Sequence, residues 1–503
     1  MKRRARIAAV LSMMVIAAGC TTQDATSPPA VGPASAGPST SAGPATSAGP
    51  ATSTPSPDSA TTSAPPSSPA ASGSATTSPA PPSPPLAGST LQVSAGLGAA
   101  PLDQPRTVQA PSGWTVSVWA RLDGARLEAW TPDGRLLVSR PDSGDVVVLT
   151  PAQSGPPRQS TLVSGLDQPH GLAFAGSTLY VAESDRVDAY DYATGAVGQR
   201  RTVVDGLPDA KSPELGGTYA HALKSVAVGA DGAVYVSVGS TGNISAEDRD
   251  ADPQRATILR VPPPGAADSG AGSAAAPAVY ARGVRNGTGL AVDPDGAVWT
   301  AVNNRDNIGY PYDRPYGSGS DSDQGKVLPA YVADHPMEEL ARLTAGRDLG
   351  WPFCNPEPDV DPGVPGSALA YGNRPFVRDV QTNADGSKLN CATLPPIEHG
   401  MGAHSAPLGL SFATRPGLPQ PYGIGALVGI HGSWNREPPR APEVSFYPWR
   451  DGSLGNQQTL LGGFQDAGGD RWGRPVMAVQ GPDRAVYVTD DAAGAVYRMQ
   501  PPA

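Results

Sequence analysis

Residues 229–237, GADGAVYVS, contain the pattern that decides the fold of this chain. The pattern returns as TPDGRLLVS at 131–139, as DPDGAVWTA at 293–301 and, with Arg484 in place of glycine, as GPDRAVYVT at 481–489. Asp-Gly between two β-prone runs favours a tight hairpin, because glycine accepts a positive φ and aspartate bonds its own backbone. Such a hairpin cannot bury its faces alone, so the copies must stack. The repeat therefore predicts an all-β fold, a β-propeller.

Six strand–turn–strand units are recognisable, beginning near residues 127, 171, 224, 289, 408 and 476. Six units predict a six-bladed propeller in one domain, over residues 91–503. Long loops at 303–350 and 352–405 interrupt the units, and long loops on a rigid scaffold are where function concentrates. The one stretch with a helical pattern is 337–345, where we expect a short helix.

The first twenty residues have the pattern of an export signal. Four basic residues precede an apolar stretch, residues 7–18, that is too short to span a membrane and ends in small residues before Cys20. The pattern resembles a bacterial lipobox, in which Cys20 carries the lipid, and an ordinary signal peptide with a chance cysteine is the alternative. We therefore predict an extracytoplasmic protein that only a lipid holds at the cell membrane.

Residues 21–90 consist almost entirely of Pro, Ser, Thr, Ala and Gly. A segment of this composition cannot bury apolar surface, so we predict a disordered linker that carries no chemistry. The net charge of the whole chain is −10 at pH 7. This acidity disfavours nucleic acid as a partner.

The chain contains three cysteines, of which Cys354 and Cys391 lie beyond Cys20. In an exported protein two cysteines most simply form a disulfide, which here would tie down a long insertion. A metal-binding or redox thiol pair is the alternative, although the CxxC spacing typical of such pairs is missing.

His221 opens the third unit, directly before the strand expected to line the central channel. A neutral imidazole at this position suits a general base near pH 7. A structural histidine bonded to a neighbouring loop would occupy the same position, and the residues alone leave both interpretations open.

Three arginines lie at equivalent ends of three units: Arg285, Arg436 and Arg474. Asn286 directly follows Arg285, and Arg436 ends the stretch HGSWNR. Converging guanidinium groups usually bind a carboxylate or a phosphate. Trp434 and Trp472, close by in the sequence, are candidates to stack on a flat ligand.

The loop Asn303-Asn304-Arg305-Asp306 directly follows the second strand of the fourth unit. Oxygen-rich loops of this kind bind Ca²⁺ through side-chain and backbone oxygens. An Asx-turn without a metal explains the same residues equally well.

These stretches together resemble the soluble pyrroloquinoline quinone (PQQ) dependent sugar dehydrogenases, and most closely the sorbosone dehydrogenase branch. The resemblance runs from about residue 113 to residue 499. The motifs that carry it are HALKSVAVGADGAVYVSVGSTGN, ARGVRNGTGLAVDPDG, GWPFC, AHSAPLGLSF, HGSWNREPP and GRPVMAVQGPD.

The resemblance implies a six-bladed propeller with PQQ and Ca²⁺ in its channel. His221 would be the base that takes the proton from the sugar hydroxyl, and Arg285 would polarise the quinone carbonyl. The residues that would hold the cofactor are Asn286, Trp434, Arg436 and Arg474. Asn304 and Arg305 occupy the place where members of that family supply backbone carbonyls to the Ca²⁺. Glu338 and Glu339 match the acidic pair that those members carry before Gly-Trp-Pro.

The chain departs from the glucose dehydrogenases of that family at three places. Ala220 replaces the acidic residue before the catalytic histidine, Trp472 replaces a second basic residue, and Asn304-Arg305 replaces the Gly-Pro of the calcium loop. All three changes fit the sorbosone branch.

The resulting prediction is a quinoprotein that oxidises an aldose or a sorbosone-like sugar to a lactone or acid and passes the electrons to an external acceptor. Two alternatives belong to other classes. One is a calcium-dependent lactonase on a six-bladed propeller, which needs a deep metal with several acidic ligands. The other is a surface propeller that binds carbohydrate or protein without catalysis.

Overall fold

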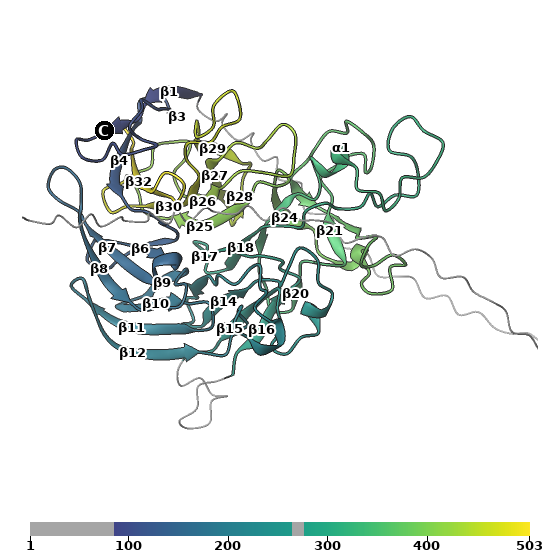
Figure 1. Cartoon of the computed structure of the whole chain (residues 1–503), viewed down its shortest axis with the longest axis horizontal. Coiled ribbons are helices and arrows are strands. Elements are labelled where there is room, and N and C mark those ends of the chain that lie inside the picture. Colours follow the sequence, from purple (N-terminus) through teal and green to yellow (C-terminus); the bar gives the residue numbers. More distant parts are fainter. Residues whose placement is uncertain (1–84, 264–275, 503) are drawn as a thin grey trace, which may run out of the picture. The chain divides into compact units, whose positions relative to one another are not determined.

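The computed structural model describes residues 85–263 and 276–502, and nearly all regular structure in them is β-strand (Figure 1). Six antiparallel sheets follow one another along the chain, and the first strand of each contacts the first strands of its two neighbours. The contacts close a ring, because the first strand of the sixth sheet also meets that of the first. The predicted six-bladed β-propeller is confirmed.

The first three blades are meanders that start at the predicted units. Blade 1 contains β5 (Glu128–Trp130), β6 (Leu136–Arg140), β7 (Asp145–Thr150) and β8 (Arg158–Ser164). Blade 2 contains β9 (Leu172–Ala175), β10 (Thr178–Ala182), β11 (Val187–Ala193) and β12 (Ala196–Val204). Blade 3 contains β13 (Val226–Val228), β14 (Val234–Val238), β15 (Thr257–Val261) and β16 (Ala278–Arg282), with β20 (Arg347–Asp348) added parallel to β16.

The other three blades include strands from the insertions and from the start of the domain. Blade 4 contains β17 (Gly289–Val292), β18 (Val298–Val302), β19 (Glu338–Arg342), β24 (Ile397–Met401) and β22 (Gly372–Arg374). Blade 5 contains β25 (Pro407–Ala413), β26 (Gly425–Ile430) and β27 (Glu443–Arg450), which pairs with both β28 (Ser453–Leu454) and β29 (Gln458–Leu461). Blade 6 contains β30 (Pro475–Gln480), β31 (Val486–Asp490), β32 (Ala495–Gln500), β4 (Thr115–Arg121) and β2 (Gln92–Val93).

The repeated turns have the predicted conformation. Gly134, Gly232 and Gly296 all have φ between 77° and 89°, and Arg484, which replaces the glycine in the last copy, is forced to φ 68°. Glycine also lets the blades approach one another at the axis. A Cβ on Gly171 would lie 2.6 Å from the backbone nitrogen of Val226 in the next blade.

The ring is closed by a strand from the start of the domain. β4 pairs antiparallel with β32, so blade 6 joins both ends of the propeller. Between blades 6 and 1, the aromatic residue of the last repeat, Tyr487, packs edge-on against Trp119 and Trp130 at centroid distances of 4.7 and 4.9 Å. The same space holds aliphatic side chains from both blades, so the core lies between neighbouring blades.

Two boundaries differ from the sequence predictions. Leu86–Thr90, predicted to be the end of the linker, forms β1 and pairs antiparallel with β3 (Thr107–Pro111), which supplies the backbone hydrogen bonds that its composition did not indicate. Residues 338–342, predicted to be helical, form β19, because pairing with β18 on one side and β24 on the other overrides the helix propensity of Glu-Glu-Leu-Ala-Arg.

The insertions contain little regular structure. They form the short helix α1 (Pro329–Val332) and the hairpin of β21 (Cys354–Pro356) with β23 (Phe376–Arg378). Single 3₁₀ turns occur here and elsewhere, at Pro141–Ser143, Pro213–Leu215, Glu247–Arg249 and Cys391–Thr393. Cys354 and Cys391 form a disulfide that ties the hairpin to the last of these turns.

The predicted signal, residues 1–20 with Cys20, and most of the predicted linker, residues 21–90, lie outside the described residues. Within the described ranges, no helix has the length and apolar character needed to cross a bilayer.

Candidate active site

The predicted site residues lie at one edge of the sheets. In an antiparallel meander, the start of the first strand and the end of the second strand meet at the same edge. His221 precedes β13, Arg285 and Asn286 precede β17, and Arg474 precedes β30, whereas Asn304 follows β18. Trp434 and Arg436 follow β26 at the same edge. The repeat therefore brings loops from separate blades to one mouth of the channel.

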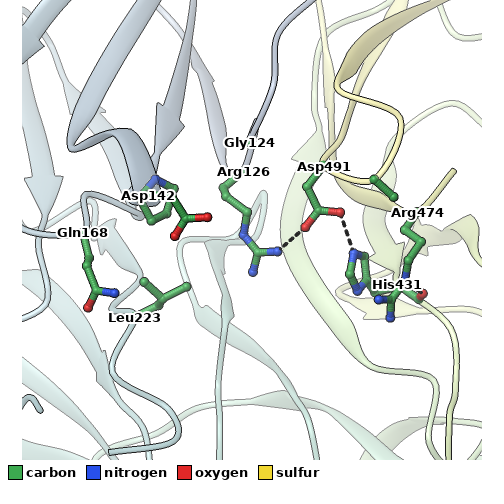
Figure 2. Close-up of a pocket in the computed structure, with 10 residues that line it drawn as sticks. Gly124, Arg126, Asp142, Gln168, Leu223, His431, Arg474 and Asp491 are labelled. Carbon is green, nitrogen blue, oxygen red and sulfur yellow. Dashed lines mark hydrogen bonds and ion pairs between the residues drawn. The ribbon is translucent and has the colours of Figure 1, made fainter. Parts of the chain in front are cut away.

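A pocket of about 640 Å³ opens at this mouth, and Figure 2 shows the side chains around it. We call it the Arg474 pocket. Four of its polar residues carry the argument below: Arg126, His431, Arg474 and Asp491. They come from blades 1, 5 and 6, and Gln168 and Leu223 add the loops before blades 2 and 3.

Asp491 links Arg126 and His431 in the Arg474 pocket. Its carboxylate accepts from Arg126 Nη1 at 2.6 Å and from His431 Nε2 at 2.8 Å (Figure 2). Burial alone would raise the pKa of Asp491, but the hydrogen bond from His431 and the charge of Arg126 outweigh it and lower that pKa to about 2. Asp491 is thus ionised at neutral pH and is fully engaged with these two partners.

Arg474, in contrast, has no carboxylate partner among the described residues. Its guanidinium donates to two backbone carbonyls, those of His431 at 2.9 Å and Gly432 at 3.5 Å. Burial lowers the pKa of Arg474, which shows that its charge is poorly compensated. Arg474 is thus a half-buried cation without a paired carboxylate, an arrangement that favours binding of an anion, although Asp142 and Asp491 line the same pocket.

His221 is held in one tautomer. Its Nδ1 lies 3.0 Å from the carbonyl oxygen of Ser240. A carbonyl can only accept, so Nδ1 carries the hydrogen and Nε2 keeps its lone pair. Burial, followed by the charge of Arg285, lowers the pKa of His221 to about 3. The imidazole is therefore neutral near pH 7, as a general base requires.

Arg285 is buried and only 5% exposed. Its Nη1 donates to the carbonyls of Asn303 and Asn304 at 3.1 and 2.7 Å, and its Nη2 donates to Asn243 Oδ1 at 3.0 Å. Asp306 lies 3.7 Å from Nη2. Arg285 thus fixes the loop after β18 and places a positive charge beside the imidazole of His221.

Asn286 lies beside His221 across Gly239. A Cβ on Gly239 would be 2.6 Å from His221 Cβ and 3.3 Å from Asn286 Oδ1. The backbone carbonyl of Asn286 also accepts from the amide of Asn303 at 2.9 Å. The structure therefore brings the predicted base, Arg285 and Asn286 together, in what we call the His221 cluster.

The sequence reasoning missed one member of the His221 cluster, His404, and named Asp306 only as part of the oxygen-rich loop after β18. His404 Nε2 donates to the carbonyl of Val332 at 2.7 Å, and its Nδ1 lies 3.4 Å from Asp306 Oδ1. Burial acts to lower the pKa of His404, but the hydrogen bond to Asp306 prevails and raises it above its usual range. His404 lies in the stretch AHSAPLGLSF, but its φ of 56° and its partner 98 positions away leave no mark in the sequence.

The four residues predicted at the calcium position make hydrogen bonds or ion pairs with other residues of the chain. The backbone amide of Asn304 donates to Glu338, and its side-chain amide donates to Glu339 Oε1 at 3.0 Å. Arg305 turns its side chain away to Asp379, at 2.6 Å, with both side chains 1% exposed. The backbone carbonyl of Asn304, one of the two carbonyls expected to face the calcium ion, accepts from Arg285 Nη1 at 2.7 Å. Glu339 Oε2 is buried and has no hydrogen-bond partner among the described residues. We derive no step through calcium.

The two tryptophans occupy opposite environments. Trp434 is 74% exposed at the rim. Trp472 is buried in the core of blade 6, where its indole donates to the carbonyl of Gly463 at 2.8 Å. The prediction that Trp472 stacks on a ligand was wrong, because its ring packs against Phe464 and Tyr497.

Arg436 does not join Arg474. Its Nη2 lies 3.4 Å from Asp334 and its Nη1 donates to the carbonyl of Ala403 at 3.4 Å. Arg126 takes the second cationic position of the Arg474 pocket instead. Sequence reasoning missed Arg126, although it precedes β5 just as Arg474 precedes β30.

Fold and site together define a six-bladed propeller with a neutral histidine and a pocket lined by Arg126 and Arg474 at one mouth of its channel. A family model described as TrAA12-like matches residues 108–501, and the chain belongs to this family. The membership confirms the predicted resemblance to PQQ-dependent sugar dehydrogenases.

Two curated relatives match parts of the chain. A pyrroloquinoline quinone-dependent pyranose dehydrogenase of Coprinopsis cinerea is 25% identical over 370 residues, which cover 65% of this chain and 45% of the relative. An uncharacterized protein of Borreliella burgdorferi is 30% identical over 112 residues, 22% of this chain and 29% of the relative. The chain thus spans less than half the length of these relatives.

Two solved structures share the fold. The holo form of the pyranose dehydrogenase PQQ domain from Coprinopsis cinerea superposes with a TM-score of 0.60 at 21% identity, covering 78% of this chain and 97% of that one. A calcium structure of a Trichoderma reesei Carbohydrate-Active Enzymes Family AA12 protein gives a TM-score of 0.61 at 22% identity, covering 78% and 96%.

Proposed function

We propose that this chain is a PQQ-dependent dehydrogenase that oxidises a pyranose or a related aldose, such as sorbosone, to its lactone or acid. The observation that carries the proposal is the pairing, at one mouth of the propeller, of an anion pocket with a neutral histidine. The membership in the TrAA12-like family and the pyranose dehydrogenase among the relatives support it.

The Arg474 pocket fits a flat ligand with several carboxylates. Arg474 has donors without an acidic partner, and Arg126 Nε is buried and has no hydrogen-bond partner in the described part of the chain. Bidentate carboxylate binding would satisfy both guanidinium groups. When bound, PQQ supplies the two-electron oxidant that no amino-acid side chain provides.

The His221 cluster supplies the base. His221 Nε2 would accept the proton from the sugar hydroxyl, because Nδ1 is committed to the carbonyl of Ser240. Burial, and next the charge of Arg285, keep the resting imidazole neutral. Asp306 and His404 anchor the loop that holds Arg285. An external acceptor would then take the electrons.

Reconstitution tests the proposal against its two competitors. We expect the purified apoprotein to bind PQQ and to reduce a dye when a pyranose is added, in parallel series with and without Ca²⁺. Lactone hydrolysis without PQQ would favour the lactonase. Sugar binding without PQQ binding would favour the non-catalytic propeller. In the described residues, the one His/Asp/Glu group with metal-site geometry lies in the insertion, which disfavours a lactonase centre in the channel.

We further propose that the protein is exported and held at the membrane by a lipid on Cys20. The basic and apolar stretches before Cys20 support this location. Expression of wild type and Cys20→Ser in a bacterial host, followed by fractionation, tests it. We expect wild type in the membrane fraction with incorporated labelled fatty acid. An equal distribution of both proteins would contradict the proposal.

A further inference from the structure

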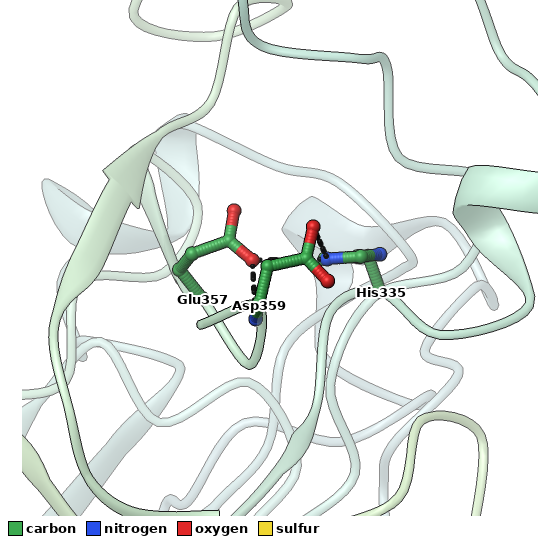
Figure 3. A group of neighbouring side chains, drawn as sticks. All are labelled: His335, Glu357 and Asp359. Atoms are coloured by element: carbon green, nitrogen blue, oxygen red, sulfur yellow. Dashed lines mark hydrogen bonds and ion pairs between the residues drawn. The ribbon is translucent and has the colours of Figure 1, made fainter. Parts of the chain in front are cut away.

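A second group of metal-ligating side chains lies in the insertion, outside the channel mouth. His335 follows α1, and Glu357 and Asp359 follow β21. Figure 3 shows the three side chains turned toward one another. His335 Nε2 is 2.9 Å from Glu357 Oε1 and 3.4 Å from Asp359 Oδ2, and the side chains are only 3%, 3% and 5% exposed. Donor atoms bound tetrahedrally at about 2.0–2.1 Å are about 3.3 Å apart, which these separations approach.

Each of the three side chains is oriented by a second partner. His335 Nδ1 donates to the carbonyl of Tyr331 at 2.8 Å, which directs Nε2 at the two carboxylates. Glu357 Oε2 accepts from the Tyr312 hydroxyl at 2.7 Å, and Asp359 Oδ2 accepts from the amide of Gly363 at 3.1 Å. A histidine whose other nitrogen donates to a carbonyl is the usual arrangement of a metal ligand.

A buried hydroxyl beside the group has no partner. Tyr331 is fully buried, and its hydroxyl makes no hydrogen bond to any described residue. Its ring stacks on the ring of His335 with centroids 3.8 Å apart and an 11° angle. A water bound to a metal at this position would give the hydroxyl its missing partner.

Charge balance also favours a cation. Within the described residues, no arginine or lysine forms an ion pair with Glu357 or Asp359. Arg374, the nearby cation, donates to their backbone carbonyls instead. A protonated His335 would compensate only one of the two buried carboxylates, and uncompensated buried charge is costly. A divalent ion with neutral His335 compensates both.

We propose that His335, Glu357 and Asp359 bind a Zn²⁺ ion, with water in the fourth position. One imidazole nitrogen and two carboxylate oxygens suit Zn²⁺, whereas Ca²⁺ takes oxygen ligands alone. The ion would join the segment after α1 to the segment after β21. It would also support the channel mouth, because Val332 of α1 accepts the hydrogen bond from His404.

Metal analysis of the full chain, purified without a polyhistidine tag and without PQQ, tests the site. We expect one zinc per chain by mass spectrometry after dialysis, and a Zn²⁺-dependent rise in the melting temperature. Glu357→Gln should weaken zinc binding by at least about 100-fold, because it removes a direct ligand. Asp361→Asn, an exposed neighbour, is the matched control and should bind zinc like wild type.

If the Glu357→Gln variant fails to fold, measurements on the wild-type protein still test the zinc site. Co²⁺ added to the metal-free wild type should give the intense visible absorption of a four-coordinate ion, and Zn²⁺ should remove it. Absence of bound zinc with an unchanged melting temperature would overturn the proposal. So would zinc binding that Glu357→Gln leaves intact, or stabilisation by Ca²⁺ but not by Zn²⁺.

Discussion

Replacing Arg305 with methionine tests whether this residue belongs to a calcium site, as the resemblance implies, or stabilises the fold through its buried ion pair with Asp379. By resemblance, Arg305 belongs to the calcium position. In the structure its Nη1 lies 2.6 Å from Asp379 Oδ2, its Nη2 donates to Gln381 Oε1 at 2.6 Å, and both charged side chains are 1% exposed. The substitution keeps the aliphatic stem but removes the charge, so it leaves the carboxylate of Asp379 buried without its ion-pair partner.

The expected loss of stability follows from these contacts. Breaking a buried ion pair by removing one partner costs about 3–5 kcal/mol. Asp379 keeps hydrogen bonds from Asn355 Nδ2 at 2.9 Å and from the amides of Gln381 and Thr382 at 3.0 and 3.1 Å. These bonds continue to solvate the carboxylate, so we expect the lower end, about 3 kcal/mol.

A double-mutant cycle in urea isolates the pair. Arg305→Met and Asp379→Asn should each lower the free energy of unfolding, and the double variant should lose less than their sum by about 2 kcal/mol. Arg201→Met is the matched control, because its ion pair with Asp191 is exposed and should contribute little that is measurable. Additive losses, or unchanged stability together with lost PQQ binding, would refute the structural role of Arg305.

Three further outcomes test the site. Because the pKa of His221 is lowered to about 3, kcat/KM should show no histidine-dependent fall from pH 7 to 5. An ordinary histidine pKa would leave about 3% of the base neutral at pH 5 and would cause a fall of about 25-fold. Burial raises the pKa of Glu338 to about 7, so this carboxyl would itself titrate between pH 7 and 5. The pH profile is therefore measured in the Glu338→Gln variant, in which residue 338 cannot titrate. Gly239→Ala places a Cβ 2.6 Å from His221 Cβ and should lower kcat by about 100-fold while a PQQ titration stays unchanged; a wild-type kcat would contradict the placement. Arg474→Ala should raise the Kd for PQQ by about 10- to 100-fold in the same titration, an effect that the exposed Arg450→Ala should not reproduce.

Local turn chemistry made the blades predictable. An Asp-Gly turn fixes the register of both strands beside it, so the predicted unit starts lie within two residues of the observed first strands. β4 was missed because the closing strand pairs with β32, more than 370 residues later, and carries no repeat. β19 was missed because its helix-forming residues become a strand through pairing that no local pattern records.

Site residues could be predicted only where their position within the repeat brings them to the channel mouth. His221, Arg285 and Arg474 were found because each precedes the first strand of a blade. The same rule applied to the first blade would have found Arg126. The positions of Asp306 and His404 depend on a contact between two insertions. The orientation of the Arg305 side chain depends on its ion pair with Asp379. No spacing in the sequence reveals either contact.

Residues that line the Arg474 pocket also join the blades at the closure of the ring. Arg126 lies in the connection between the closing strand β4 and β5, and its partner Asp491 follows β31 of blade 6. The carbonyl of Arg126 also accepts from the Thr489 hydroxyl at 2.6 Å, so the backbone and the guanidinium are both fixed to blade 6. Asp491 in turn holds His431 of blade 5. An anion bound between Arg126 and Arg474 would therefore bridge the seam of the ring, and binding of such a ligand would stabilise the closed propeller as well as fill its mouth.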